Sequence, residues 1–203
     1  MFETDSGLIR FLTRVCDLII LNILLILTCV TVVFSGDGVV SLYTVTLRML
    51  RGMEDSPGKS FLRALRANFI PSVPLMLLLL VDVLLIVALR QILYAETLLL
   101  SPTLFVFLTI AALFLTALLS YLFPLLARFE NSFLHHLGNA GRLAVVNLPV
   151  TFLLAAVNLL PVLLPLFLPQ LTGVVIAFWL LIGFSAGAYV NSFYLNGIFT
   201  QTN

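Results

Sequence analysis

One carboxylate lies in the middle of a long hydrocarbon segment. Asp82 is the one polar residue in the segment 77–87, and the remaining ten side chains of this segment are all aliphatic. A charge near the middle of a membrane span costs roughly 2.5–3.5 kcal/mol on insertion scales, so such a residue normally faces other helices and has a polar partner. Asp82 therefore has two interpretations. It belongs to a binding or proton-relay site, or it makes a hydrogen bond that fixes the helix register, in which case the carboxyl is neutral if water does not reach it.

Asn158 is expected at a similar depth on another helix. Asp82 follows Asn68 by 14 residues and Asn158 follows Asn147 by 11, and a proline comes shortly after each of those first asparagines. If both helices run outward from the cytoplasm, both polar groups lie in the outer half of the bilayer. We expect Asp82 and Asn158 to pair there and to form a polar pocket.

Three prolines, Pro161, Pro165 and Pro169, follow Asn158. Each removes a backbone donor, so we expect the outer end of this helix to be kinked or unwound. Broken backbone at membrane depth is tolerated where it lines a cavity, as in many transporters. Plain termination of the helix is the alternative. The prolines therefore add to the case for an outward-facing pocket.

The segment 183–187 matches the Gly-x-Ser-x-Gly pattern of serine hydrolases. That pattern works at a sharp strand-to-helix turn, which exposes the serine beside a histidine and an oxyanion hole. Here Ser185 falls inside an apolar helix, and His135 and His136 fall in a cytoplasmic segment. Gly183 and Gly187 are instead spaced for the close approach of two helix backbones. We predict helix packing and no enzymatic activity.

The adjacent histidines raise the question of a metal, because imidazole is a common ligand. Neighbouring helical residues point about 100° apart, and only Glu130 lies at a suitable ligand spacing from His135 and His136. We expect no metal and no cofactor, and we expect both histidines to be solvated at the membrane interface. The sequence also lacks a Walker loop, a His-Glu-x-x-His motif and the coupling segment of an ABC permease subunit.

The composition explains why Asp82 stands out. Of 203 residues, 62% are hydrophobic and 9% are charged, against roughly 45–50% and 25% in soluble domains. A membrane-spanning helix needs roughly 20 apolar residues to cross about 30 Å of hydrocarbon. The candidate spans are residues 15–34, 69–89, 103–127, 143–168 and 172–194, with a shorter run at 38–50.

The distribution of charge decides whether the short run crosses. The basic residues are Arg10, Arg14, Arg48, Arg51, Lys59, Arg63, Arg66, Arg90, Arg128 and Arg142. If residues 38–51 cross, nine of these ten lie on one side, as the positive-inside rule requires. We therefore predict an all-α polytopic membrane helix bundle of about six helices, a single domain over residues 1–203, with both termini cytoplasmic. Outward loops are predicted around residues 35–37, 91–101 and 169–172.

Short amphipathic helices are predicted at the cytoplasmic face. Lys59, Arg63 and Arg66 follow a helical spacing within residues 57–69, opposite an apolar face, which is typical of a helix on a lipid or partner surface. Similar patterns occur at residues 8–17 and 129–137. Extension of a membrane helix is the alternative for all three. A short repeat at residues 60–62, 132–134 and 192–194 further suggests three helical hairpins.

Several separated blocks of the sequence carry a family resemblance. They are Leu-Asn-Ile-Leu-Leu-Ile-Leu at 21–27, Gly-Asp-Gly at 36–38, Leu-Tyr-Thr-Val at 42–45, Arg-Gly-Met-Glu at 51–54, Phe-Leu-Arg-Ala-Leu-Arg-Ala-Asn-Phe at 61–69, Tyr-Leu-Phe-Pro-Leu-Leu-Ala-Arg-Phe at 121–129, Leu-Gly-Asn-Ala at 137–140 and Gly-Phe-Ser-Ala-Gly-Ala-Tyr-Val-Asn-Ser-Phe at 183–193. In these blocks the chain resembles the YesL-like family of bacterial membrane proteins. It departs from the family at 30–36, where a Pro-x-x-Thr-x-Gly segment is expected.

The resemblance implies a compact protein of the bacterial cytoplasmic membrane, whose genes often accompany sugar uptake and glycoside degradation and whose activity is not established. Our first hypothesis is an accessory or sensing component of carbohydrate uptake that contacts a sugar transport complex through Lys59, Arg63 and Arg66. The alternative is a small transporter or channel with a pocket around Asp82 and Asn158. The lipid bilayer is the expected surrounding and a homo-oligomer is left open. The formal charge of +1 argues against nucleic acid as a partner.

Overall fold

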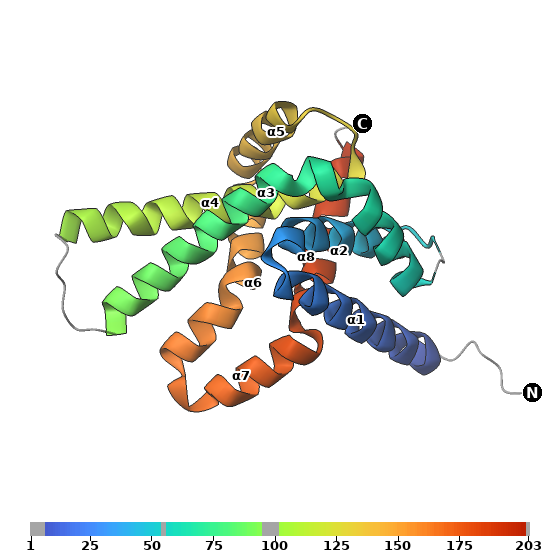
Figure 1. The fold of residues 1–203 in the computed structure, drawn as a ribbon, viewed down its shortest axis with the longest axis horizontal. Helices are drawn as coiled ribbons and strands as arrows, with labels where there is room; N and C mark the ends of the chain where they lie inside the picture. Colours follow the sequence, from blue (N-terminus) through green and yellow to red (C-terminus); the bar gives the residue numbers. More distant parts are fainter. Residues whose placement is uncertain (1–6, 54–55, 95–101, 202–203) are drawn as a thin grey trace, which may run out of the picture.

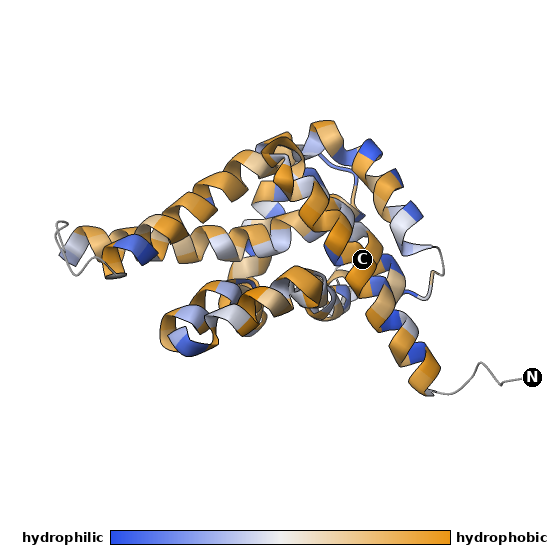
Figure 2. Cartoon of the chain, turned by 60° about the horizontal axis from the view of Figure 1, so that its bottom comes forward, coloured by the Kyte–Doolittle hydropathy of each residue, from blue (hydrophilic) through white to orange (hydrophobic). Residues whose placement is uncertain are grey.

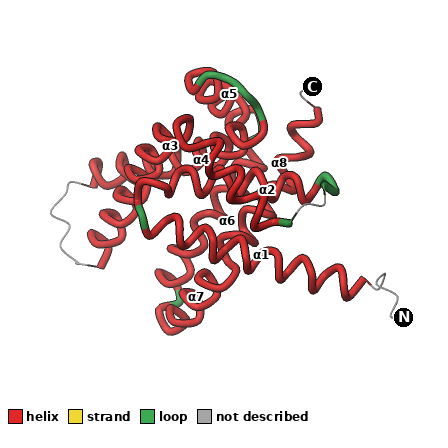
Figure 3. The backbone as a smooth tube through the Cα atoms, turned by 45° about the vertical axis from the view of Figure 1, so that its right-hand side comes forward, coloured by secondary structure: helices red, strands yellow, loops and turns green. Residues whose placement is uncertain are grey.

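The structure is a computed structural model that describes residues 7–53, 56–94 and 102–201. These residues form helices joined by short turns, and no strand occurs among them (Figure 3). The elements in chain order are α1 (Gly7–Val30), η1 (Val32–Phe34), α2 (Ser35–Leu50), α3 (Pro57–Tyr94), α4 (Pro102–Arg128), α5 (Phe133–Val146), α6 (Leu148–Phe167), η2 (Pro169–Leu171), α7 (Thr172–Phe178), η3 (Trp179–Gly183) and α8 (Phe184–Gln201). The segments η1 and η2 are 3-10 helices and η3 is a π-helix.

Five of the described helical segments are long and apolar enough to cross a membrane. They are Gly7–Val30, Pro57–Leu93, Pro102–Arg128, Leu148–Phe167 and Pro169–Thr200. Large apolar side chains such as Phe107, Phe114 and Phe152 are exposed on their outer faces, and hydrophobic residues predominate along these helices in Figure 2. Such extensive apolar surface is favourable against lipid and unfavourable against water. The predicted polytopic bundle of membrane helices is confirmed.

Helix α2 is the inner helix of the bundle. Its 16 residues would cover about 24 Å, which is less than the roughly 30 Å of hydrocarbon in a bilayer. Eleven of these residues are buried, and α2 contacts α1, α3, α4 and α8. Its many polar residues are accommodated because protein rather than lipid surrounds it. That α2 crosses the bilayer as a sixth span stays a prediction.

Two glycines bring α2 close to its neighbours. A Cβ atom on Gly36 would lie 2.8 Å from the backbone nitrogen of Met76 on α3, and one on Gly38 would collide with Thr28 on α1. The predicted outward loop at residues 35–37 is wrong, because these residues form the first turn of α2 and Asp37 is only 1% exposed. The connection between α1 and α2 is made instead by the preceding segment, η1.

Successive long helices alternate in direction. In Figure 1 the start of α1, the end of α2, the start of α3 and the end of α8 lie toward the right, whereas the end of α3 and the start of α4 lie toward the left. This arrangement agrees with three antiparallel hairpins formed by α1 and α2, by α3 and α4, and by α6 and α8.

The segment predicted as a separate surface helix is the first part of α3. This helix runs without a break from Pro57 to Tyr94 and contains Pro71 and Pro74. Each of these prolines lacks the N–H that would bond one turn back, and its ring crowds the preceding turn. Figure 1 accordingly shows α3 bent between its first part and its longer remainder. The alternative of a helix extension holds here and for residues 8–17, which lie within α1.

The segment before α6, which was predicted to be cytoplasmic, also differs from the prediction. Residues 129–132 are not helical, so the amphipathic helix expected at 129–137 begins later, at Phe133. A single span was expected at 143–168, but Asn147 leaves the helical conformation with φ −112° and ψ 47° and separates α5 from α6. Pro149 stands in the first turn of α6, where the missing N–H costs nothing and the residue before it resists helix continuation.

The C-terminal end of α6 stays helical through Pro161 and Pro165 and ends at Phe167. The expected unwinding is therefore wrong, the expected kink stays a prediction, and Pro169 starts η2 after the helix ends. A proline inside a membrane helix is tolerated where neighbouring groups satisfy the backbone that it frees.

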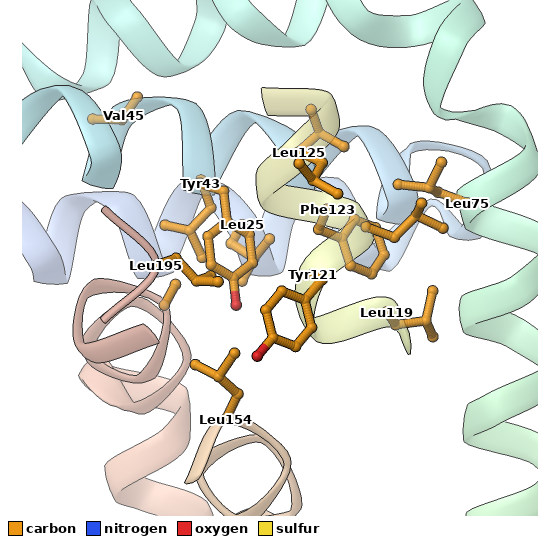
Figure 4. Packing of buried hydrophobic residues seen from close by; sticks show 14 of the residues in the cluster. Leu25, Tyr43, Val45, Leu75, Leu119, Tyr121, Phe123, Leu125, Leu154 and Leu195 are labelled. Atoms are coloured by element: carbon orange, nitrogen blue, oxygen red, sulfur yellow. The ribbon is translucent and has the colours of Figure 1, made fainter. Parts of the chain in front are cut away.

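The centre of the core is formed by α1, α2, α4, α6 and α8. Tyr43 and Tyr121 lie buried there beside Leu25, Leu154 and Leu195 (Figure 4). The Tyr121 hydroxyl lies 2.9 Å from Thr151 Oγ1, which joins α4 to α6. This packed region adjoins the polar groups of the candidate site.

Candidate functional site

Asp82 is buried between α3 and α4. It is 5% exposed, and its carboxylate accepts from Thr116 Oγ1, which lies 3.0 Å from one oxygen and 3.2 Å from the other. The Thr116 hydroxyl carries a single hydrogen, whereas a carboxylate can accept about four hydrogen bonds. Asp82 therefore keeps most of its acceptor capacity, and no other hydrogen bond to it is recorded among the described residues.

Asn158 does not bond Asp82 directly, so the predicted pairing of these two residues is wrong. Asn158 Nδ2 donates to Ser120 Oγ of α4 at 2.8 Å, and its Oδ1 accepts from Asn191 Nδ2 of α8 at 2.9 Å. Helix α4 lies between the two predicted residues. Its Thr116 bonds Asp82, and its Ser120, one turn later, bonds Asn158. The sequence did not single out this hydroxyl pair.

A chain of polar groups thus crosses the bundle. Asn191 Nδ2 donates to Tyr43 Oη at 3.1 Å as well as to Asn158. Ser120 Oγ donates to the backbone oxygen of Thr116 at 2.7 Å, and the Thr116 side chain reaches Asp82. The chain connects α2, α8, α6, α4 and α3. Its members occupy five separate places in the sequence, which is why sequence spacing alone found only two of them.

A cavity of about 660 Å³ joins these groups. Asp82, Thr116, Ser120, Asn158 and Tyr43 supply polar groups to its wall, and almost all of its other lining residues are aliphatic or aromatic. Of the residues that the structure describes, no lysine, arginine or histidine lines this cavity. A concave, mostly apolar site with a few polar groups is the usual form of a small-molecule site.

The cavity opens toward the lateral, lipid-facing surface of the bundle. The exposed residues in its wall include Val30, Val83, Val87, Leu180 and Phe184. These belong to helical segments that are apolar enough to face lipid. A molecule dissolved in the bilayer could therefore reach Asp82 from the side.

The Gly-x-Ser-x-Gly segment lies at the junction of η3 and α8, where its serine is packed inside the bundle. Ser185 is fully buried, and its hydroxyl donates to the backbone oxygens of Leu18 at 2.7 Å and Ile182 at 2.9 Å. A hydroxyl so placed cannot attack a substrate. A Cβ on Gly183 would meet the side chain of Trp179, in the same helical segment, at 2.7 Å, so this glycine makes room for that ring and not for a second helix backbone. A Cβ on Gly187 would lie 3.4 Å from the Val157 side chain of α6, and close approach of two backbones there stays a prediction.

Asn22 is a further polar residue in a membrane helix that sequence reasoning missed. It is fully buried on α1, where its amide donates to the backbone oxygens of Trp179 at 3.0 Å and Leu180 at 2.8 Å. Its side-chain oxygen accepts from Ser185 N at 3.0 Å. The available signal was the same as for Asp82, a lone polar residue in an apolar run, but Asn22 carries no charge and stood out less.

The basic residues Lys59, Arg63 and Arg66 are all exposed on the first part of α3. Phe61 and Ala64, on the opposite side of this segment, are buried. We call these three residues the basic stripe. That lipid phosphates or an acidic partner bind this stripe stays a prediction from the sequence.

The two histidines on α5 differ, which corrects the expectation that both are solvated. His135 is exposed, but His136 is only 1% exposed. Burial, and to a smaller extent the neighbouring His135, lower the pKa of His136, while the nearby backbone of Phe129 acts in the opposite direction. Across residues 7–53, 56–94 and 102–201, no group of three or more His, Cys, Asp or Glu side chains could hold a metal ion.

Comparison with known proteins adds one match. Residues 18–90 match the model of a family described as a protein of unknown function, DUF624. The matched segment runs from α1 through α2 into α3 and includes Asp82, and it confirms the resemblance to the YesL-like family over these residues. No curated protein and no solved structure matches the chain.

Proposed function

We propose that this chain is a non-enzymatic membrane protein that binds an amphiphilic organic cation in the cavity beside Asp82, as a small transporter does. The observation that carries the proposal is a buried carboxylate with one hydroxyl partner in the wall of a large apolar cavity. An ionised carboxylate in such surroundings is stabilised by an opposite charge. No basic residue of the cavity wall supplies one, so a bound cation would.

The lateral opening supports the same ligand class. Hydrocarbon parts of the ligand would pack on residues such as Leu79 and Phe123, and the charged group would reach Asp82. A free sugar suits this wall poorly, because each buried hydroxyl needs a hydrogen-bond partner and few polar groups are present. The chain also offers no activated nucleophile at this site, so binding and transport suit the cavity better than catalysis.

A pair of probes with the same shape and opposite charge tests this proposal. Tetraphenylphosphonium and tetraphenylborate would be titrated into the purified protein in lipid nanodiscs. We expect the cation to bind and the anion not to bind, and Asp82→Asn to weaken cation binding by about tenfold or more, as expected when a buried charge pair is lost. Asp17→Asn is the matched control, because Asp17 does not line the cavity.

Two results would contradict the proposal: equal binding of both probes, or an unchanged affinity in Asp82→Asn. The variant is expected to stay folded, because an asparagine oxygen can still accept from Thr116. A thermal unfolding measurement on each variant separates a lost site from a lost fold. Uptake of the cation into liposomes that contain the protein then distinguishes transport from binding alone.

The basic stripe favours a second candidate function. In it, the chain is an accessory or sensing component associated with carbohydrate uptake and utilisation, and Lys59, Arg63 and Arg66 contact an acidic surface of a sugar transport complex. The stripe is exposed on the first part of α3, which lies toward the same side of Figure 1 as the start of α1. Affinity purification of the wild type and of a variant with all three residues changed to Gln tests it. A specific partner lost only in the variant supports this role, and a partner retained by both contradicts it.

The proposed location is the bacterial cytoplasmic membrane, with six passes and both termini in the cytoplasm. The alternation of helices in Figure 1 supports placing the start of α1 and the end of α8 on the same side, and the distribution of basic residues favours the cytoplasm as that side. On this assignment the basic stripe faces the cytoplasm, and the end of α3 that follows Asp82 faces outward.

A further inference from the structure

A second, more polar cavity lies at the end of the bundle where α4 and α8 end. It has a volume of about 410 Å³ and is bounded by the end of α4, the segment after it, α5 and the end of α8. The polar residues in its wall are Asn131, His136, Asn139 and Arg142. This cavity shares no lining residue with the cavity beside Asp82.

His136 is the buried group of this cavity. It is 1% exposed, and neither ring nitrogen has a hydrogen-bond partner among the described residues. A buried imidazole loses its hydration, and the nearby backbone of Phe129 offsets only part of that loss. A ligand in the cavity would supply an acceptor for the ring N–H, which explains why a polar side chain occupies this place.

Three other donor side chains line the same space. Asn139 and Arg142 follow His136 at intervals of three residues on α5, so all three fall on one side of that helix. Asn131 comes from the segment between α4 and α5. Arg142 and Asn131 are exposed, which keeps the guanidinium and one amide within reach of a ligand that enters from outside.

The surroundings favour an anion. Among the residues that the structure describes, no Asp or Glu lines the cavity, and Glu130 is not one of its lining residues. The rings of Phe129 and Phe199 form an apolar side of the cavity. The Arg128 guanidinium lies 5.5 Å and 5.3 Å from the centres of these two rings, which places a second positive charge behind this wall.

We propose that this cavity binds the phosphate group of an organic phosphate. Arg142 provides a planar donor fork suited to phosphate oxygens, and the two amides and the imidazole add donors from other directions. Together these side chains carry more N–H groups than the roughly four hydrogen bonds that a carboxylate can accept, and a phosphate, with three or four oxygens, can accept from more of them. The remaining volume beside Phe129 and Phe199 accommodates the organic part.

The phosphate could belong to a lipid headgroup or to a soluble ester, and the experiment has an arm for each. The full-length protein is placed in phosphatidylcholine nanodiscs and titrated with glycerol 3-phosphate, with glycerol as the neutral control. In the second arm, part of the phosphatidylcholine is replaced by phosphatidic acid. Binding is measured as a rise in unfolding temperature and as a change in the ring-nitrogen signals of ¹⁵N-labelled histidine, with His135→Gln used to assign His136.

We expect at least one phosphate source to raise the unfolding temperature and to raise the pKa of His136, because a phosphate dianion near the ring favours its charged form. Arg142→Gln should weaken this response by about tenfold, and it should fold normally because Arg142 is exposed. Arg10→Gln, an exposed arginine outside the cavity, should respond like the wild type. Asp82→Asn should also respond like the wild type, so this proposal and that for the first cavity can fail separately.

The two arms assign the source. A response to glycerol 3-phosphate alone assigns a soluble ester, and a response to phosphatidic acid alone assigns a lipid headgroup. The proposal is overturned if glycerol 3-phosphate acts no differently from glycerol while phosphatidic acid acts no differently from phosphatidylcholine. It is also overturned if Arg142→Gln responds like the wild type.

Discussion

Asn22 of α1 and Ser185 of α8 are joined through the Ser185 backbone, whose N–H donates to Asn22 Oδ1 at 3.0 Å. The Asn22 amide also donates to two carbonyl oxygens of η3. A π-helical turn leaves backbone groups without their regular α-helical partners, and in a membrane no water replaces them. One asparagine therefore makes the π-helical segment possible and ties the first helix to the last.

Replacing Asn22 by leucine should destabilise the protein by about 2 kcal/mol. Three hydrogen bonds are lost, and bonds between membrane helices contribute about 0.6 kcal/mol each on average. The measurement is the free energy of unfolding in mixed detergent micelles. Asn68→Leu is the control, since the Asn68 side chain bonds only Ala64 O of its own helix and its loss should cost clearly less. Equal effects of the two changes would mean that the Asn22 bonds do not hold α1 to η3.

Gly36→Ala should destabilise the protein by about 1–3 kcal/mol, the usual range for overpacking. The added Cβ would lie within 3.0 Å of three Met76 atoms, two of them backbone, so α2 and α3 would have to separate. Gly197→Ala is the control, because nothing lies within 4 Å of a Cβ there. In a helix, that change should be neutral or stabilising by up to about 1 kcal/mol. The measurement is the thermal unfolding of the two variants. A Gly36→Ala protein as stable as Gly197→Ala would contradict the close packing of α2 against α3.

The sequence predicted the helices better than it predicted their partners. Long apolar runs and the distribution of arginines identify the membrane helices, because the bilayer imposes length and polarity on each one separately. Asp82 was recognised as a residue that faces protein for the same reason. Its partner Thr116 could not be recognised, because a hydroxyl can bond its own helix backbone and costs little in a membrane helix. The boundary at Asn147 depends on local turn chemistry that hydropathy does not detect.

Cysteine labelling tests the orientation. Asp37 is too buried to serve as a labelling site, so exposed Thr31 and Gln170 are better positions for the outer side, and Lys59 and Ser132 for the cytoplasmic side. Single cysteines at these positions would be introduced after Cys16 and Cys29, which are free and exposed, are changed to Ser.

An impermeant reagent added to intact cells should label positions 31 and 170 and should reach 59 and 132 only after the membrane is opened. Labelling of position 31 from the cytoplasmic side would show that α2 does not cross and that the chain has five spans.

Asn158→Leu should destabilise the protein more than Asp82→Leu. Asn158 bridges α4 and α8 through Ser120 and Asn191, so its loss removes two interhelical bonds and costs about 1 kcal/mol. Asp82 accepts from one hydroxyl, and replacing a buried carboxylate by an apolar side chain can be neutral or stabilising. Unfolding of both variants in detergent without ligand measures the difference. An Asp82→Leu variant that is the less stable of the two would show that the carboxylate has a structural role beyond its bond to Thr116.

Lowering the pH should destabilise the ligand-free protein through His136. Burial lowers the pKa of His136 in the folded state below its ordinary value of 6.5, so near and below pH 6.5 the unfolded chain binds more protons than the folded one. The free energy of unfolding then falls as the pH falls through 6.5 and is unaffected by this group well above it. Unfolding measured between pH 8 and pH 5.5 should show this decrease in the wild type and in His135→Gln, and a smaller one in His136→Asn. If His136→Asn keeps the full decrease, the proton is taken up elsewhere and His136 is not held neutral by burial.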